Sequence, residues 1–510
     1  MAGGGGRWHW WLVFLAVAGV TVVSALTNPL MGAPDEPEHT VKAVAVARGD
    51  LTSDYERIEQ PGLFGLSSPR TELEVPSGYR RLRPLWVCWA TRIRVPASCA
   101  PPLVDRPGTA TVATAAGSYP PLYYGVTGLP SRVFGPRRAV YAMRLLSGAV
   151  FAALLATAVM AARRATRGPL ILAGLALAVT PTVVFLGGAL NPNGVEIAAA
   201  IALWCGLLEL LSDRQRRPDR RMALRLAVPA VIMVAMRPLS PALLLTIVGF
   251  VVIVLAEPSE LRERWQSRSL RVATAVVAIG GVVSVGYLLL SRAVSAVGTY
   301  AVLEQRSAGD VLSDGPKTVG DSVEQMVAVL GWVGRGAMFL PTWALRTWVL
   351  AGLVLVVGGI VLGRTRARIG VIVLTAGALG FPIVSQLLSR GTGWQGRYGL
   401  PLAVGIPIVA GWAVDRSGKL PARIATVVAV VVVSLTVLVQ VVAHQRYMTR
   451  VVVGLPNGLF DSLSNGRWNG PGTPWLLLVA CVLTSVAFAV VLLFPLRKGG
   501  AEVQVEAGPG

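Results

Sequence analysis

Charged side chains are scarce in this sequence. Asp, Glu, Lys and Arg together make up 14% of the 510 residues, whereas hydrophobic residues make up 54% and the mean hydropathy is +0.61. A soluble protein carries about 25% charged residues, so this composition argues against an ordinary soluble fold. The apolar residues also gather into runs of about 17 to 23, the length that crosses the hydrocarbon core of a membrane. The sequence therefore predicts an all-α polytopic membrane protein.

Basic patches with interleaved aromatic residues are missing as well, although the formal net charge is +21. The basic residues instead form short clusters between the apolar runs, as expected of cytoplasmic loops. This distribution argues against nucleic acid as a partner. The clusters are Arg163, Arg164 and Arg167; Arg214, Arg216, Arg217, Arg220 and Arg221; Arg262, Arg264 and Arg268; Arg364, Arg366 and Arg368; and Arg416, Lys419 and Arg423.

About twelve apolar runs qualify as transmembrane helices. If the N-terminus lies in the cytoplasm and the spans alternate, every basic cluster falls on the cytoplasmic side, which predicts a multi-pass plasma-membrane protein with both termini in the cytoplasm. We interpret the first run as an uncleaved anchor rather than a signal peptide, because no clear A-x-A site follows it. The expected spans are residues 10–27, 139–161, 169–188, 194–211, 223–236, 239–256, 271–291, 343–362, 369–388, 398–414, 421–443 and 474–495.

This register divides the chain into membrane segments and three loops outside the membrane. The pair 223–236 and 239–256 is alternatively a broken or re-entrant element, because Arg237-Pro238 interrupts the run. The expected organisation is a cytoplasmic N-terminus and first span (1–27), a large extracytoplasmic loop with an interfacial helix (28–138), spans two to seven (139–291), a second loop (292–342), spans eight to eleven (343–443), a third loop (444–473), and a last span with a cytoplasmic tail (474–510).

Cysteine is rare, with four residues in the chain. Cys88 and Cys99 lie in the first loop, in the stretch CWATRIRVPASC, with ten residues between them. Two cysteines this close together on an oxidising face indicate a disulfide. Cys205 and Cys481 fall inside expected spans, where a cysteine packs as a small core residue.

The stretch PDEPEHTVKAVAVARGD, residues 34–50, directly follows the first span and is unusually acidic. Helix-start chemistry explains part of it: Asp35 suits the N-cap and Glu38 suits the third helical position, which together form a capping box. Gly49 would supply the C-cap. An apolar stripe that includes Val41 and Val44 would let the helix lie flat in the membrane interface.

Capping does not require Glu36 or His39, so a catalytic interpretation stands beside it. A carboxylate held rigidly just outside a membrane span is suited to act as a general base on a lipid-borne substrate. Asp35 and Glu36 are the candidate carboxylates. Asp35 and His39 share a helix face, where they could form an acid–imidazole pair or contribute two ligands to a divalent cation; no cofactor is otherwise indicated.

Five segments together resemble a known family. In order they are PDEPEH (34–39), YPPLYYGVTGLP (119–130), GALNPNGVE (188–196), GWQGRYGLPL (393–402) and HQRYMTR (444–450). The set resembles the bacterial domain-of-unknown-function 2142 membrane-protein family, which is placed near the GT-C class of polyprenyl-phosphate-sugar glycosyltransferases. That family often carries an aromatic residue where this chain has Glu38.

The resemblance implies a fold, a reaction and site residues. It implies a GT-C-like helical membrane protein in which an acid of the first outer loop, here Asp35 and secondarily Glu36, acts as general base. The donor would be a polyprenyl-phosphate sugar, and the anomeric carbon would invert. The acceptor partner would be a cell-envelope glycan or glycolipid.

A phosphate donor needs cationic groups on the outer side, where Arg offers a planar, bidentate fork. Arg397 and Arg446 are the preferred candidates, although an interfacial arginine can equally anchor lipid head groups. Tyr398 and Trp394 beside Arg397 could stack on a sugar. The other outer-side candidates are Arg237, Arg335, Arg346, Arg390 and Arg450.

Two further features leave alternatives open. Tyr123, with Tyr119 and Tyr124, suits either an interfacial belt or a wall that stacks on carbohydrate. Glu196 lies one turn inside a span, where an acid is a functional candidate, but with Asn193 it also suits a helix cap.

A membrane glycosyltransferase is the function that these residues favour. The rivals are a transporter or flippase of lipid-linked glycans, which would explain the spans and outer arginines, and a non-catalytic envelope-assembly protein in which the acidic stretch is only a capped helix.

Overall fold

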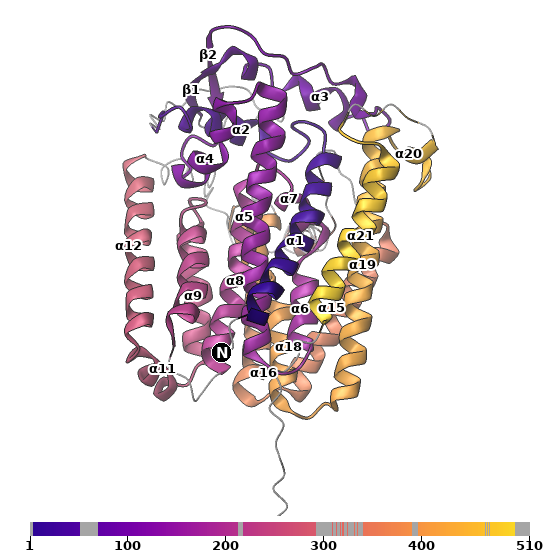
Figure 1. Cartoon of the computed structure of the whole chain (residues 1–510). Coiled ribbons are helices and arrows are strands. Elements are labelled where there is room, and N and C mark those ends of the chain that lie inside the picture. The colour runs from indigo at the N-terminus through magenta and orange to yellow at the C-terminus, as the bar shows by residue number, and fades with distance from the viewer. Residues whose placement is uncertain are drawn as a thin grey trace, which may run out of the picture.

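The structure is a computed structural model that describes residues 4–51, 70–212, 218–291, 340–389 and 396–494 (except 465, 467 and 469), and isolated positions between 292 and 339. It is a bundle of long helices with a smaller folded region at one end (Figure 1). Each of the expected apolar runs overlaps a helix. The predicted all-α membrane architecture is therefore confirmed.

Eight helices in the described ranges are long and apolar enough to cross a membrane. They are α1 (Gly4–Thr27), α5 (Pro136–Ala165), α8 (Pro192–Ser212), α12 (Arg268–Leu290), α15 (Thr342–Leu362), α16 (Thr365–Ser389), α19 (Ala422–Val452) and α21 (Pro474–Leu493). The shorter apolar helices are α9 (Arg220–Val234), α10 (Ser240–Phe250, continued by a π-helical turn over Val251–Leu255), α17 (Leu400–Ala403) and α18 (Gly405–Ser417).

The expected span 169–188 is not one continuous helix. It consists of α6 (Leu170–Ala178) and α7 (Pro181–Gly187), which meet at an angle of 63° and count as a ninth span only if taken together. Pro181 explains the break, because a proline disfavours helical geometry in the residue before it. Thr180 has extended backbone and its side chain accepts a hydrogen bond from the backbone N–H of Val183, so it caps the second half.

Helix α8 lies at the centre of the bundle. Its candidate membrane window is entirely buried, whereas only 17% of the corresponding window in α12 is buried. Neighbouring helices α5 and α9 pack against α8. The loop before α8 is therefore surrounded by protein at the end of the bundle that carries the smaller folded region.

That smaller region, which we call the cap, comprises the described residues 28–51 and 70–135. It lies over one end of the bundle, opposite the labelled N-terminus (Figure 1). Strands β1 and β2 pair antiparallel, with Thr71 opposite Thr114. The cap contains α2 (Glu36–Val46), β1 (Thr71–Pro76), η1 (Ser77–Tyr79), α3 (Pro84–Ala90), η2 (Ala97–Cys99), β2 (Thr109–Thr114), α4 (Pro121–Thr127) and η3 (Leu129–Arg132).

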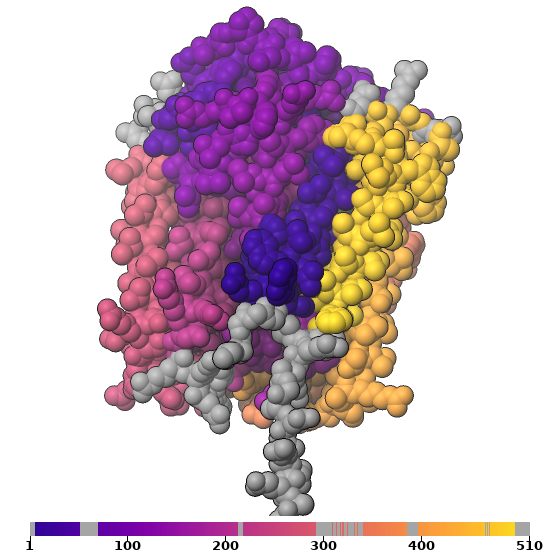
Figure 2. All heavy atoms as spheres, viewed as in Figure 1, coloured from indigo at the N-terminus to yellow at the C-terminus, as the bar shows by residue number. Residues whose placement is uncertain are grey.

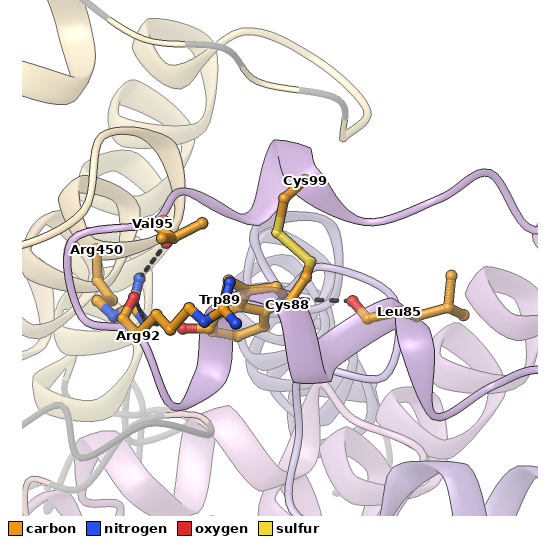
Figure 3. The surroundings of a disulfide bond; sticks show 7 residues. All are labelled: Leu85, Cys88, Trp89, Arg92, Val95, Cys99 and Arg450. Atoms are coloured by element: carbon orange, nitrogen blue, oxygen red, sulfur yellow. Dashed lines mark hydrogen bonds between the residues drawn. A yellow bond between two sulfur atoms is a disulfide. The ribbon is translucent and has the colours of Figure 1, made fainter.

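A disulfide closes a loop within the cap, and an arginine fastens that loop to α19. Cys88 of α3 is bonded to Cys99 of η2, the pair that the sequence indicated. The fully buried Arg450 of α19 enters the loop between them and donates to the carbonyl oxygens of Trp89, at 2.5 Å, and Val95, at 2.9 Å (Figure 3). Arg450 was a candidate phosphate ligand, but its guanidinium is directed to backbone carbonyls of the cap.

Candidate functional site

Asp35 immediately precedes α2 and adopts left-handed backbone geometry, with φ of 58°. Its side chain makes no capping hydrogen bond, and the Glu38 carboxylate instead accepts from the backbone N–H of Ala115 at 2.8 Å and pairs with Arg70 at 3.2 Å. The predicted capping box is therefore wrong. Tertiary partners outcompete the local backbone for both carboxylates.

Helix α2 is buried on nearly all sides. Every residue of α2 except Glu38 is buried, so the prediction of an amphipathic helix lying flat in the interface is also wrong. Even Lys42 is fully enclosed, and its ammonium donates to the carbonyl oxygen of Gly117 at 3.0 Å. Burial lowers the pKa of Lys42 to about 8, an effect that the charge of Asp50 partly opposes.

Glu36 and Arg144 form a completely buried ion pair. Arg144 donates to both carboxylate oxygens of Glu36 at 2.7 Å. The same guanidinium also donates to the carbonyl oxygens of Ala25, Asn28 and Pro29 at the end of α1. Glu36 thus joins the first span to the cap. A carboxylate so enclosed is placed to hold the structure together rather than to accept a proton from a substrate.

Asp35 has the opposite environment. It pairs with Arg397 of η5 (Gly396–Tyr398), yet 45% of its side chain is exposed, whereas the Arg397 side chain is only 2% exposed. Within the described part of the chain, Nε and Nη1 of Arg397 have no hydrogen-bond partner. A buried guanidinium with unused donors is costly unless a ligand meets them.

A second buried arginine lies beside this pair. Arg237, between α9 and α10, donates to Asn193 at 2.6 Å and to Glu196 at 3.0 Å. Its guanidinium carbon lies 4.4 Å from the ring centroid of Tyr398, and the guanidinium carbon of Arg397 lies 5.5 Å from the same centroid. Both cations are therefore within cation–π range of Tyr398.

The loop GALNPNGVE packs directly against the acidic stretch. The side-chain amide of Asn191 donates to the carbonyl oxygen of Pro34 at 2.9 Å, and the backbone N–H of Leu190 donates to Glu36 at 3.2 Å. Asn191 also accepts from the backbone N–H of Asn193 at 3.0 Å, so it caps α8. The capping role that the sequence allowed for Glu196 is wrong, because its carboxylate accepts hydrogen bonds from Arg237 and from the hydroxyl of Ser240.

Aromatic residues of the cap complete the surroundings. His39 shares a hydrogen bond of 2.9 Å between Nδ1 and the hydroxyl of Tyr124, and its ring lies against Tyr119. Tyr119 is partly exposed. Burial of its hydroxyl raises the pKa of Tyr119 to about 12, although nearby Arg237 acts in the opposite direction. Tyr123 is buried against Ser147 of α5 at 3.0 Å, so it is core rather than a sugar-stacking wall.

The remaining candidates lie elsewhere. Arg446 is partly exposed on α19, where it donates to the carbonyl oxygen of Asn457 at 3.3 Å, and Arg346 is exposed on α15. Trp394, Arg335 and Arg390 lie outside the described residues. No group of three or more His, Cys, Asp or Glu side chains that could hold a metal ion occurs in the described ranges.

Sequence reasoning missed Arg144. The residue lies one to two turns inside an apolar run, and a charge within a span is a functional candidate by default. The same signal identified Glu196 as a candidate and was overlooked at Arg144. No local signal could identify the partner of Arg144, because Glu36 lies 108 positions away in the sequence.

This fold, a polytopic helical bundle with a cap over one end, defines an integral membrane protein. The family described as predicted membrane protein, DUF2142, matches residues 18–406. The chain belongs to this family, as the order of its five motifs had indicated.

Comparisons with other known proteins are more distant. No curated protein matches the chain. Among solved structures, ArnT from Cupriavidus metallidurans bound to undecaprenyl phosphate is 16% identical, with a TM-score of 0.44 over 95% of this chain and 76% of that one. The apo form of the same ArnT is 15% identical, with a TM-score of 0.43 and the same coverage.

Proposed function

We propose that this protein is an inverting glycosyltransferase that uses a polyprenyl-phosphate sugar as donor on the outer face of the plasma membrane. The acceptor would be a cell-envelope glycan or glycolipid. The observation that carries this proposal is the contact between the half-exposed Asp35 and the buried Arg397, which has unused N–H donors. A carboxylate and an anion-binding group side by side are what sugar transfer from a phosphate requires.

The reaction would proceed in one displacement. Asp35 takes the proton of the acceptor hydroxyl while the acceptor oxygen forms a bond to the anomeric carbon. The bond between that carbon and the phosphate oxygen breaks on the opposite face, and its electron pair leaves with the polyprenyl phosphate. Arg397 and Arg237, both at least nine-tenths buried, would stabilise the additional negative charge on the leaving phosphate.

Arg397 would have a different partner before and after the donor binds. In the structure its Nη2 donates to Asp35, so one carboxylate oxygen is occupied by the guanidinium. A donor phosphate would compete for the same guanidinium and release Asp35 to accept the proton of the acceptor. Donor binding would therefore activate the base, and the enzyme would be held inactive without donor.

The surrounding residues would position these groups. The Glu36–Arg144 pair fixes the start of α2 to the end of α1, which sets the position of Asp35 relative to the bundle. Tyr119 and Tyr398 are both partly exposed beside the two arginines. Their rings offer surfaces on which a sugar could stack.

The test is sugar transfer in membrane vesicles that contain the whole protein and polyprenyl-phosphate donors. Asp35→Asn should lower the transfer rate by about 10²- to 10⁴-fold, the usual contribution of general base catalysis, with normal membrane insertion. Glu72→Gln, an exposed acid of β1 in the same cap, is the matched control and should retain the parental rate. Unchanged transfer by Asp35→Asn would refute the assignment of the base.

A further inference from the structure

One stretch of the cap is strongly basic. Residues 77–104 contain five arginines and no Asp, Glu or Lys. The stretch runs through η1, α3 and the disulfide loop, and all five arginine residues are exposed. We call this surface the arginine face. Its members are Arg80, Arg81, Arg83, Arg92 and Arg94.

The fold gathers these arginines around one short helix. Three of them lie directly before α3, the last as its N-cap residue. The other two lie in the loop after α3, and the disulfide ties that loop back to the helix (Figure 3). Because α3 has only seven residues, the two groups are separated by about 10 Å along its axis.

The arginine face has no counter-charges in the described part of the chain. None of its five guanidinium groups forms an ion pair or a hydrogen bond with the described residues. In the same cap, by contrast, Arg70 pairs with Glu38 at 3.2 Å. Like charges gathered without counter-charges repel one another and destabilise a compact fold. Such a surface is suited to an anionic partner, which relieves the repulsion when it binds.

The arginine face lies beyond the lipid head groups. Arg144 of α5 meets the carbonyl oxygens at the end of the first span, and Pro136 begins α5 eight residues earlier. Pro136 packs closely on Gly78, directly before the arginines. Eight helical residues rise about 12 Å, whereas a head-group layer is only about 5–8 Å thick. Figure 2 shows the cap projecting beyond the ends of the surrounding helices.

The arginine face also lacks the apolar centre of a protein interface. The tryptophans between the arginines, Trp86 and Trp89, are buried, and the exposed large hydrophobic side chains in this stretch are only Ile93 and Val104. Protein interfaces have an apolar, aromatic-rich core from which charged residues are depleted. The composition of this surface therefore favours an extended polyanion over a folded protein.

We infer that the arginine face docks an acidic glycan of the cell envelope, whose anionic groups accept hydrogen bonds from the planar guanidinium groups. The inference rests on the proposed function, because it makes this polymer the acceptor of the transferred sugar. Docking itself requires no donor and no general base. It can therefore be measured apart from sugar transfer.

The test is binding of fluorescent polygalacturonate, a carboxylated glycan, to right-side-out membrane vesicles that contain the whole protein and no sugar donor. In these vesicles the basic cytoplasmic loops do not meet the probe. An exposed ion pair strengthens binding by a factor of about 1.5 to 5. Arg92→Gln should weaken binding by this factor, and Arg92→Gln with Arg94→Gln by about 2- to 25-fold. Binding to the parent should also weaken as salt is added.

The controls separate the arginine face from other charges and from catalysis. Arg346→Gln, at an exposed position on α15, is the matched control for Arg92→Gln and should bind as the parent does. Neutral dextran should not bind. Asp35→Asn should still bind the polymer while sugar transfer is lost, so a failure of the proposed reaction and a failure of docking give different results.

Three outcomes would overturn the inference. Equal binding of dextran would show that charge is not recognised. Unchanged binding by the double variant and by the triple glutamine variant of Arg80, Arg81 and Arg83 would show that these arginines are not the contact. Loss of co-purifying phosphatidylglycerol without loss of polymer binding would assign them to lipid head groups. Membrane insertion is checked for both variants, and if one fails to insert, the other decides.

Discussion

The two neighbouring acids at the start of α2 should separate stability from activity when each is neutralised. Glu36→Gln would leave the guanidinium of Arg144 buried without its counter-ion, in a site where both side chains are 0% exposed. Removing one partner of a buried ion pair costs about 3–5 kcal/mol. Asp35→Asn should cost far less, because 45% of the Asp35 side chain remains in contact with solvent.

These energies translate into measurable shifts. For a chain of 510 residues, a loss of about 3–5 kcal/mol corresponds to a fall of about 3–5 °C in the unfolding midpoint. Arg144→Met should be worse than Glu36→Gln, because it also strands the carbonyl oxygens of Ala25, Asn28 and Pro29, at about 1–3 kcal/mol for each carbonyl that stays buried. Thermal unfolding in detergent, followed by tryptophan fluorescence, measures all the variants alike.

A double variant supplies the internal control. Glu36→Gln combined with Arg144→Met removes both charges, so the double variant should be less destabilised than the sum of the two single changes. The rescue should be partial, because the three carbonyls stay unpaired. If Glu36→Gln unfolds within about 1 °C of the parent, a shift worth only about 1 kcal/mol, the structural role given to this pair is wrong. An equal loss of stability in Asp35→Asn would refute the contrast between the two acids.

Three further outcomes follow from other parts of the cap and site. The pKa of Lys42 is about 8 in the folded protein and 10.5 ordinarily, so between these pH values the unfolded chain binds more protons than the folded one. The free energy of unfolding should therefore rise from pH 8 to 10.5. Lys42→Met should flatten that rise when the unfolding midpoint is measured across this pH range. Replacing Cys88 and Cys99 by serine should lower the free energy of unfolding by about 3 kcal/mol, because the disulfide closes a loop over a separation of 11 residues. If reduction of the disulfide left the unfolding midpoint of the parent protein unchanged, this prediction would be contradicted. Arg397→Ala should lower sugar transfer by about 10²- to 10³-fold, whereas Arg446→Ala should leave it unchanged, and equal losses in the vesicle assay would place both arginines in the same role.

Features that depend on local composition could be predicted from the sequence. The apolar runs predicted the helices because hydropathy is a property of each segment alone, and the spacing of Cys88 and Cys99 was short enough to indicate their bond. Pro181 carried the signal for the break between α6 and α7. That signal was overlooked because the run 169–188 is continuously apolar.

The local interpretation of the acidic stretch failed for a physical reason. A capping box satisfies backbone N–H groups at a helix start, but Asp35 and Glu38 have stronger charged partners in the folded protein, Arg397 and Arg70. Arg397 lies 362 positions from Asp35. Nothing in the spacing of either motif could show that the two meet, and only the resemblance to a family suggested that both belong to one site.

The attachments of the cap have a consequence for the order in which the protein is made. The cap ends at residue 135, yet the arginine that fills its disulfide loop is Arg450, and the partner of Asp35 is Arg397. The cap is therefore translated early and anchored late. Until the ribosome has passed Arg450, the disulfide loop lacks its central side chain and Asp35 lacks its counter-ion. The site that we propose for catalysis thus cannot form before Arg397 has been translated, long after the cap itself is complete.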